Sequence, residues 1–573
     1  MRAGRLFRSI AVAACFVLAF EAVARQAHLL DPTDRPDPYL GFPGTSPLYR
    51  PEPAEDGGTV MRRSPNRNLY RPAEFPADKP PGEFRVFCVG GSSVRLDAFM
   101  DPDGSFPGML ELLLQGALPE GRTARVINAG GGGTGSVQNL ETVREALELH
   151  PDLLVVYPEG GEKNFIPPAP QGVMARADDA SPARVFARRL LARSRCYVAA
   201  RELYDSLLPA SPDTSNSLAA FSAFAIYAIS RPFSADSFSR LFEMKDDHVP
   251  PVMPHPIPAE EITHAHARFV RNLQTMAELA RERGVPLLFV DPVRNIKASF
   301  YLRFHLDPSE ILPGHVPEWR RMYENGLEAK RAGRTAEAIV KLRAVRKHYV
   351  DDHDEILAFY LGQCFEQLGR WDEARAEFEK PYLQHPMRGL IAQAAAASGV
   401  PVIDPYPYLL GVSEHGLPGY DEFTDSFHPM PKVSRVIARA ILDGIRGLAI
   451  VPDLRPDDAQ ELKVADQLAL RVVARCRVPP ASRMQRSISV GDNQEAIRIA
   501  RALPREELFS DKHVFEAIYL GWALSREGDV EGAREVYDGL KSSRWKPKGG
   551  LPPLDTVEHI VINAYGGDLF SWF

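Results

Sequence analysis

The sequence has few cysteines, and none of them forms a pattern that holds a metal ion or a disulfide framework. The five cysteines are spread over 573 residues and include no CxxC pair. Cysteine zinc sites and disulfide-rich folds need closely spaced or regularly repeated cysteines. We therefore expect no metal site and no cofactor.

Positive charge is not in excess either. Lys and Arg number 68 against 75 Asp and Glu, which gives a formal net charge of -7. Proteins that bind nucleic acids usually carry a basic patch or stripe. We expect no nucleic-acid partner.

Long apolar runs are also lacking. The stretches Ile10 to Phe20 and Leu218 to Ile229 both fall short of the ~20 residues that a membrane-spanning helix needs. We expect the second stretch to be a packed helix or a lid near the functional site.

The first stretch has the features of an export signal. Three arginines precede it, and an A-x-A end, Ala22-Val23-Ala24, follows it after Glu21, as in a secretory signal. We expect export to the periplasm or another extracytoplasmic location. Cleavage after Ala24 would release a soluble protein, whereas retention would leave a short membrane anchor. We favour the anchor because apolar residues continue past Glu21.

From residue 83 onward, short apolar runs alternate with helical patterns. This alternation is typical of a parallel α/β sheet, in which sites form at the carboxyl ends of the strands. We expect strands at 85–89, 125–128, 153–157, 285–290 and 400–403, and helices at 110–118, 140–149, 259–283 and 387–398.

Two regions break this alternation with a spacing that predicts paired helices. Residues at the offsets of the tetratricopeptide consensus are Gly362, Phe365, Gly369, Ala374, Phe378 and Pro386, preceded 36 residues earlier by Gly326, Gly333, Ala338 and Leu342. A further match near the C-terminus comprises Gly521, Leu524, Gly528, Ala533 and Tyr537. Small residues at these offsets let paired helices approach closely. Such repeats bind partner proteins or buttress their own domain, and the sequence leaves both open.

These patterns divide the chain into six parts. They are 1–25, a signal peptide or membrane anchor; 26–80, a Pro- and Arg-rich linker that wraps a domain surface; 81–313, the first part of the α/β domain with a helical insert at 166–257; 314–386, the tetratricopeptide-like insertion; 387–450, the second part of the α/β domain; and 451–573, a C-terminal helical tetratricopeptide-like domain.

A serine follows the first predicted strand directly after two glycines. Gly90 and Gly91 allow a sharp turn, which projects Ser92 above the edge of the sheet. At the start of a helix, the Ser92 amide can point at a developing negative charge. The second strand likewise ends in an N-x-G block, Asn128–Gly130. A phosphate-binding or purely structural turn has the same glycine pattern.

A D-x-x-H sequence lies beyond the last predicted strand. Asp425 and His428 then lie on one side of a single turn. The carboxylate can accept a hydrogen bond from one imidazole nitrogen while the other nitrogen takes a proton from a serine. An inert surface pair has the same spacing.

Together these blocks resemble the SGNH/GDSL hydrolases, especially an exported bacterial branch that carries tetratricopeptide repeats. The resemblance covers about residues 35–450, apart from the repeat insertion. It implies a flavodoxin-like α/β fold, a three-layer parallel sheet with helical insertions, with all-α repeat segments added. It also implies Ser92 as the nucleophile, His428 as the general base, Asp425 as its partner, and an oxyanion hole from the amides of Ser92 and Gly130.

One block departs from the family pattern. After the third strand the family has Gly-x-Asn, whose Asn side chain donates to the oxyanion. Here Glu159 replaces the glycine and Gly161 stands at the Asn position. Losing one oxyanion donor typically costs ~3 kcal/mol of transition-state stabilisation. Asn164, one turn later, is the candidate replacement donor.

The resemblance implies a serine esterase or deacylase outside the cytoplasm. Its substrate would be an acylated small molecule or an acylated polysaccharide of the envelope. Two alternatives stay open. A catalytically weak scaffold would bind a protein partner through its repeats, with the altered block marking lost activity. An O-acyltransferase would pass the acyl group to a sugar hydroxyl instead of water.

Overall fold

The computed structural model describes most of the α/β part, the repeat helices and short pieces of both terminal regions. The described residues are 18–27, 46–55, 57–67, 70–96, 104–132, 134–159, 194–196, 259–297, 312–349, 355–383, 385–424, 427–476, 492–509 and 514–529, with isolated shorter pieces between 480 and 539.

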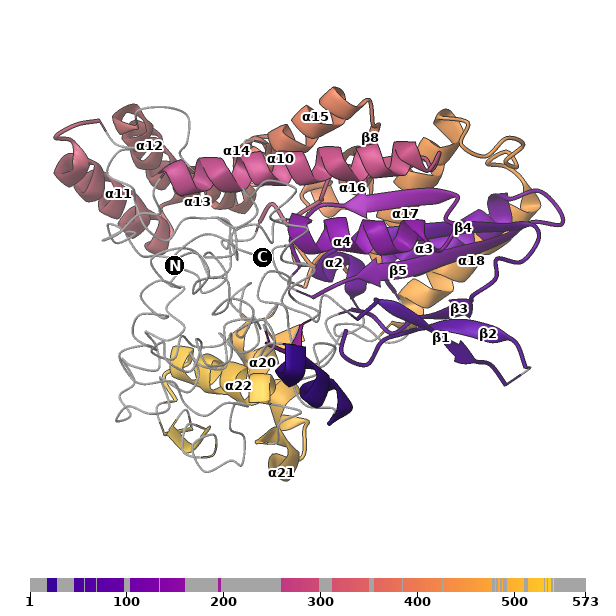
Figure 1. Ribbon diagram of the computed structural model, residues 1–573. Coiled ribbons are helices and arrows are strands. Elements are labelled where there is room, and N and C mark those ends of the chain that lie inside the picture. Colours follow the sequence, from indigo (N-terminus) through magenta and orange to yellow (C-terminus); the bar gives the residue numbers. More distant parts are fainter. Residues whose placement is uncertain are drawn as a thin grey trace, which may run out of the picture.

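Five parallel strands form the central sheet (Figure 1). They are β4 (Glu83–Gly90), β5 (Thr123–Gly130), β6 (Leu153–Tyr157), β7 (Leu287–Val290) and β8 (Val402–Ile403), in the spatial order β5-β4-β6-β7-β8. Each lies where the sequence predicts a strand, with ends shifted by a few residues. Counted along this sheet, the order is 2-1-3-4-5, a doubly wound order whose switch point lies between β4 and β6.

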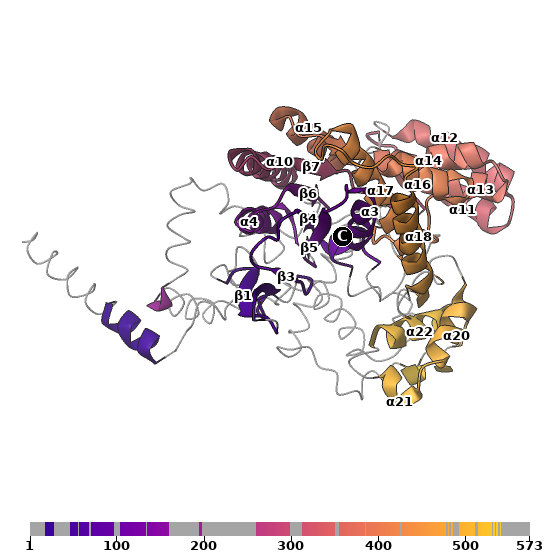
Figure 2. The same ribbon diagram turned by 90° about the vertical axis from the view of Figure 1, so that its right-hand side faces the viewer.

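Helices cover both faces of this sheet (Figure 2). On one face lie α3 (Phe106–Ala117) and α17 (Pro431–Gly447); on the other lie α4 (Ser136–Leu147), α10 (Ala259–Glu282) and α15 (Pro386–Ser398). The result is a three-layer α/β arrangement, as the sequence predicts.

The two faces of β4 belong to two separate hydrophobic cores. Val86 and Cys88 pack in the core beneath α3 and α17, whereas Phe87 and Val89 pack in the core beneath α4 and α10. All four side chains have no exposed surface. Successive side chains of a strand point to opposite faces, and a parallel strand covered on both faces is apolar throughout. This explains the continuous apolar run before Ser92.

A small antiparallel sheet lies where the sequence predicts a linker at 26–80. Its strands are β1 (Tyr49–Pro53), β2 (Thr59–Arg63) and β3 (Glu74–Pro76), in the order β1-β2-β3. Tyr49 and Phe75 pack with Phe87 of the central sheet, with ring centroids 5.1 to 6.3 Å apart. The segment therefore covers the α/β core as a folded sheet rather than as an irregular linker.

The repeat helices are inserted between β7 and β8. They are α11 (Val316–Arg331), α12 (Thr335–Val345), α13 (Glu355–Gln367) and α14 (Trp371–Leu383). The predicted close approach of the paired helices is present. A Cβ added to Gly326 would lie 2.6 Å from Leu342, and one added to Gly362 would lie 2.7 Å from Phe378.

One helix beyond residue 450 shares the core of the α/β domain. α18 (Gln460–Arg475) packs against α3 and α17, and Leu462 and Ala469 belong to the core beneath α3. The sequence assigned these residues to a separate C-terminal unit. The later helices α20 (Asn493–Arg501) and α22 (Val514–Arg526) pack against each other instead.

The remaining elements are short. They are α2 (Ser92–Arg95), η5 (Arg346–His348), α16 (Tyr406–Val412), η6 (Glu414–Gly416) and α21 (Arg505–Leu508).

The described residues include no helix that is both long and apolar enough to cross a bilayer. Residues 18–26 are helical. The rest of the expected signal, and the insert 166–257 apart from 194–196, lie outside the described residues.

Candidate active site

The carboxyl ends of β4, β5 and β6 lie level with one another. Gly90 at the end of β4 pairs with Gly130 on one side and with Tyr157 on the other. The residues that follow these three strands therefore meet at one rim of the sheet, next to the switch point where ligands bind in doubly wound folds.

The turn between β4 and Ser92 leaves no room for larger residues. A Cβ on Gly90 would lie 2.5 Å from the Tyr157 carbonyl oxygen, and a Cβ on Gly91 would collide with the Glu159 carboxylate. Ser92 begins α2 and is partly exposed, while Ser93 behind it is buried. The Ser92 amide makes no hydrogen bond to any described residue. Ser92 thus presents both a hydroxyl and an unused N–H at the rim.

His428 comes from the opposite end of the domain sequence and meets Ser92 at this rim. Its Nε2 lies 2.8 Å from Ser92 Oγ, although 336 positions separate the two residues. His428 is only 6% exposed, and its ring lies 4.2 Å from that of Phe427. With the proton on Nδ1, Nε2 accepts the Ser92 O–H, which is the geometry of a nucleophile and its general base.

Backbone hydrogen bonds hold the His428 loop in place. The Thr424 amide donates to the His428 carbonyl oxygen at 3.1 Å, and the Met430 amide donates to that of Glu422 at 2.8 Å. Ser93 Oγ donates to the Phe427 carbonyl oxygen at 3.2 Å. Ser93, the neighbour of Ser92, thereby fixes the loop that carries His428.

Three of the residues singled out from the sequence cannot be placed. Asp425, the predicted partner of His428, lies outside the described residues, and so do Gly161 and Asn164.

Asn128 and Gly130 tie β5 to the turn that carries Ser92. Asn128 Nδ2 donates to the Val94 carbonyl oxygen at 2.8 Å, and its Oδ1 accepts the Gly130 amide at 3.0 Å. A Cβ on Gly130 would collide with the Arg95 backbone. The Gly130 amide, predicted as an oxyanion donor, is thus already engaged, and a bound oxyanion would have to share it with Asn128.

Glu159 lies directly behind the nucleophile turn. It is 7% exposed, and its Oε1 accepts the Ser93 amide at 2.8 Å, while Oε2 has no hydrogen-bond partner among the described residues. Burial raises the pKa of Glu159, against the opposing effects of Ser93 and of positive charge on His428 and Arg294. The sequence shows Glu159 only as a departure from the family pattern; its burial beside Ser93 depends on the fold.

The segment after β7 supplies a second buried carboxyl group. Asp291 Oδ2 lies 2.8 Å from Arg388 Nη2. Burial raises the pKa of Asp291 to about 6, although the Arg388 charge opposes this. The Val293 amide donates to the Tyr157 hydroxyl at 3.0 Å, which fixes the end of β7 to the end of β6.

A separate cluster of titratable side chains lies away from the Ser92 rim. Among the described residues, the one set of His, Cys, Asp and Glu side chains spaced to hold a metal ion is His315, Glu318 and His348. These residues belong to the repeat insertion.

The comparisons with known proteins concern the repeat insertion. Residues 357–380, which span most of α13 and α14, match the tetratricopeptide repeat family. This confirms the tetratricopeptide repeat predicted for the helical pair that contains Gly362 and Phe378. A search of curated proteins found no match to the chain.

Proposed function

We propose that this chain is a serine hydrolase of the SGNH/GDSL type that cleaves an ester bond. The observation that carries the proposal is the 2.8 Å contact between His428 Nε2 and Ser92 Oγ. The pair stands at the carboxyl end of β4, beside the switch point of the sheet. Its two members are the serine and histidine that the sequence resemblance selects.

The proposed reaction begins with proton transfer from Ser92 Oγ to His428 Nε2 as Oγ attacks the ester carbonyl carbon. The tetrahedral oxyanion accepts a hydrogen bond from the Ser92 amide. The imidazolium then gives its proton to the departing alcohol oxygen, which leaves an acyl-serine. Water, deprotonated by His428, attacks this ester and releases the acid, and Ser92 recovers its proton. Asp425 is proposed to orient the imidazole through Nδ1.

Oxyanion stabilisation is the weak part of this site. The Ser92 amide is unused by described residues, whereas the Gly130 amide donates to Asn128. Each donor to the oxyanion is worth ~3 kcal/mol. We propose Asn164 as a further donor, because Gly161 at the family position has no side chain to offer.

The proposed substrate is an acylated small molecule or an acylated polysaccharide outside the cytoplasm. The basic and apolar N-terminal sequence supports export. Retention of the N-terminus as a short anchor is part of the proposal; Glu21 Oε2 accepts from Ser194 Oγ at 2.9 Å and from the Cys196 amide at 3.1 Å. Cleavage after Ala24 would remove these contacts.

The first prediction tests serine-dependent turnover. Purified wild type, Ser92→Ala and His428→Ala are compared on p-nitrophenyl acetate and longer acyl esters. We expect each substitution to lower kcat/KM by on the order of 10³-fold or more, because nucleophile and base act as a unit. His150→Asn is the control, since His150 is exposed, lies outside the rim and has a positive φ that Asn tolerates.

Labelling with a fluorophosphonate gives an independent readout. We expect wild type and His150→Asn to be labelled on Ser92 and Ser92→Ala to stay unlabelled. Equal turnover by all four proteins, or a wild type that neither turns over esters nor takes the label, would reject the hydrolase. Acyl transfer to an added oligosaccharide, in place of release to water, would reassign the acceptor to a sugar hydroxyl.

A second role, binding of a protein partner through the repeats, is supported by the tetratricopeptide match at 357–380. Val340 on α12 is 70% exposed and suits a photo-crosslinking side chain, with Leu468 on α18 as the control position. A defined partner cross-linked only from position 340 would support this role. Cross-links confined to the chain itself would favour buttressing.

A further inference from the structure

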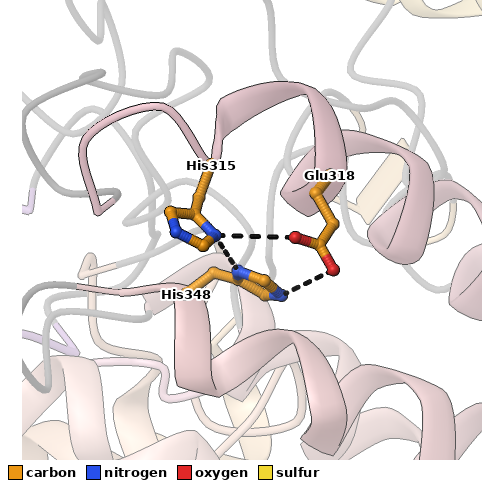
Figure 3. Close-up of side chains that lie close together, drawn as sticks. All are labelled: His315, Glu318 and His348. Carbon is orange, nitrogen blue, oxygen red and sulfur yellow. Dashed lines mark hydrogen bonds and ion pairs between the residues drawn. The ribbon is translucent and has the colours of Figure 1, made fainter.

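Two histidines and a glutamate meet at the first helical pair of the repeat insertion (Figure 3). His315 immediately precedes α11, Glu318 lies in the first turn of that helix, and His348 ends η5, directly after α12. The Leu312 amide also donates to the His348 carbonyl oxygen at 2.8 Å. The three side chains therefore lie where the start of α11 meets the end of the following helix.

Their nitrogen and oxygen atoms converge. His315 Nδ1 lies 3.2 Å from His348 Nδ1 and 3.5 Å from Glu318 Oε2. One ligand atom from each residue can be chosen so that all three lie within 4.8 Å of one another. Two neutral imidazoles whose Nδ1 atoms face each other share at most one proton, so at least one lone pair points into the gap between them.

His348 is buried, and one of its ring nitrogens has no hydrogen-bond partner among the described residues. Its side chain is 4% exposed, and its Nε2 makes no hydrogen bond within the described part of the chain. Burial lowers the pKa of His348, with Glu318 opposing the shift. The neutral imidazole that results is the form that binds metal ions. Buried polar groups without a partner are uncommon and call for an explanation.

We propose that His315 Nδ1, His348 Nδ1 and Glu318 Oε2 bind a divalent transition-metal ion, with Zn²⁺ as the best fit. Two imidazoles and one carboxylate form a donor set that zinc prefers. Water completes the coordination, because the side chains of His315 and Glu318 are 45% and 44% exposed.

The spacing of the ligand atoms fits a tetrahedral ion. Zn–N bonds of about 2.0–2.1 Å at tetrahedral angles place neighbouring ligand atoms about 3.3 Å apart. The observed separations from His315 Nδ1, 3.2 and 3.5 Å, lie on either side of this value. With Nδ1 of His348 on the metal, its Nε2 carries the proton and faces Glu318 Oε1 at 3.9 Å.

The ion would link the start of α11 to the segment that follows α12. Tetratricopeptide helices are stabilised by packing against their neighbours in the array, and this is the first pair of the insertion. A ligand that binds only the folded state adds stability that rises with its concentration. The site is independent of the hydrolase chemistry, since it uses none of the residues at the Ser92 rim.

The test uses tag-free, full-length protein stripped with a chelator and titrated with Zn²⁺ by calorimetry. We expect one equivalent to bind and the thermal midpoint of unfolding to rise. His315→Gln and Glu318→Gln each remove one half-exposed ligand without disturbing the core, and we expect at least ~10-fold weaker binding. His150→Asn controls for exposed histidine and should bind as wild type does. Co²⁺ should give the visible d–d bands of a four-coordinate ion in wild type, and these bands should be lost in both variants.

Two results would overturn the metal site. One is binding that is substoichiometric, or equally strong in His315→Gln, Glu318→Gln and wild type. The other is a thermal midpoint that responds to pH but not to Zn²⁺, which would identify the three side chains as a proton-sharing cluster.

Discussion

Glu159 is a buried carboxyl group next to Ser93, the residue that follows the proposed nucleophile. It accepts the amide of Ser93, and that residue's hydroxyl in turn binds the loop of His428. Glu159 is therefore linked, through Ser93, to both the Ser92 turn and the His428 loop. A positive charge on His428 would lower the pKa of Glu159, against the larger effect of burial.

We predict that Glu159→Gln shifts the acidic limb of the kcat/KM–pH profile to lower pH. A negative charge on Glu159 favours the protonated imidazolium of His428, and the Gln side chain removes that preference. Catalysis needs neutral His428, so the active form persists to lower pH. Gln keeps an oxygen for the Ser93 amide, and a purely structural role would leave the limb in place. The profile with p-nitrophenyl acetate is the measurement. A limb that does not move would mean that Glu159 keeps its proton throughout, in line with the burial that raises its own pKa.

At the residue scale, the sequence was enough to predict those site residues that belong to short local motifs. Gly90-Gly91-Ser92 and the D-x-x-H block name the serine and histidine that lie 2.8 Å apart, because glycine turns and short spacings are local. The burial of Glu159 is not local, since β4, β6 and the His428 loop together create it. The pairing of His315 with His348 links positions 33 residues apart, and no spacing rule connects them.

At the scale of the element, glycines at helix contacts allow the helices of the repeat insertion to pack closely. Gly362 on α13 lies against the ring of Phe378 on α14, which is 2% exposed. Helices joined by a tight turn can approach this closely only where a side chain is missing. The sequence showed this through spacing alone, because the repeat imposes the same offsets on each helical pair.

We predict that Gly362→Ala destabilises the insertion by about 1–2 kcal/mol. The added methyl group would lie 2.7 Å from the Phe378 ring, and such overpacking costs about 1–3 kcal/mol, more than Ala gains in a helix. Gly389→Ala on α15 is the matched control, because nothing lies within 4 Å of its added Cβ, and it should gain about 0.5–1 kcal/mol. Urea unfolding followed by circular dichroism compares the two. Equal stability in both variants would refute the close contact.

The small sheet β1-β2-β3 shows why some strands could not be predicted from the sequence. β1 reads Tyr-Arg-Pro-Glu-Pro, and only its first residue is buried. Prolines and arginines in so short a strand hide the period-2 pattern on which a strand prediction depends. The apolar residues that hold this sheet, such as Tyr49 and Phe75, pack against Phe87 in a strand of the other sheet. A central strand such as β4 has no such difficulty, because burial on both faces makes it apolar throughout.

At the scale of the whole molecule, α18 joins the C-terminal region to the helical layer behind the rim that carries Ser92. Gly116 of α3 lies so close to α18 that an added Cβ would be 2.6 Å from the Cβ of Ala465. Arg435 on α17 donates to both oxygens of Asp466 on α18, at 2.9 and 2.6 Å. α3 in turn begins beside Ser105, whose hydroxyl accepts from Asn128 at 3.3 Å. A chain of direct contacts thus runs from α18 to the strand end next to Ser92.

We predict that Leu462→Ala destabilises the α/β domain by about 2–5 kcal/mol, the usual cost of emptying a buried leucine site. Leu462 is 1% exposed and packs in the core beneath α3, whereas Leu468 on the same helix is 42% exposed. Leu468→Ala is therefore the matched control and should stay within about 0.5 kcal/mol of wild type. The midpoint of urea unfolding, followed through loss of Ser92 labelling by a fluorophosphonate, reports the domain that contains the site. If both variants lose labelling at the wild-type urea concentration, α18 contributes nothing to that domain, and the C-terminal region folds as the separate unit that the sequence alone predicts.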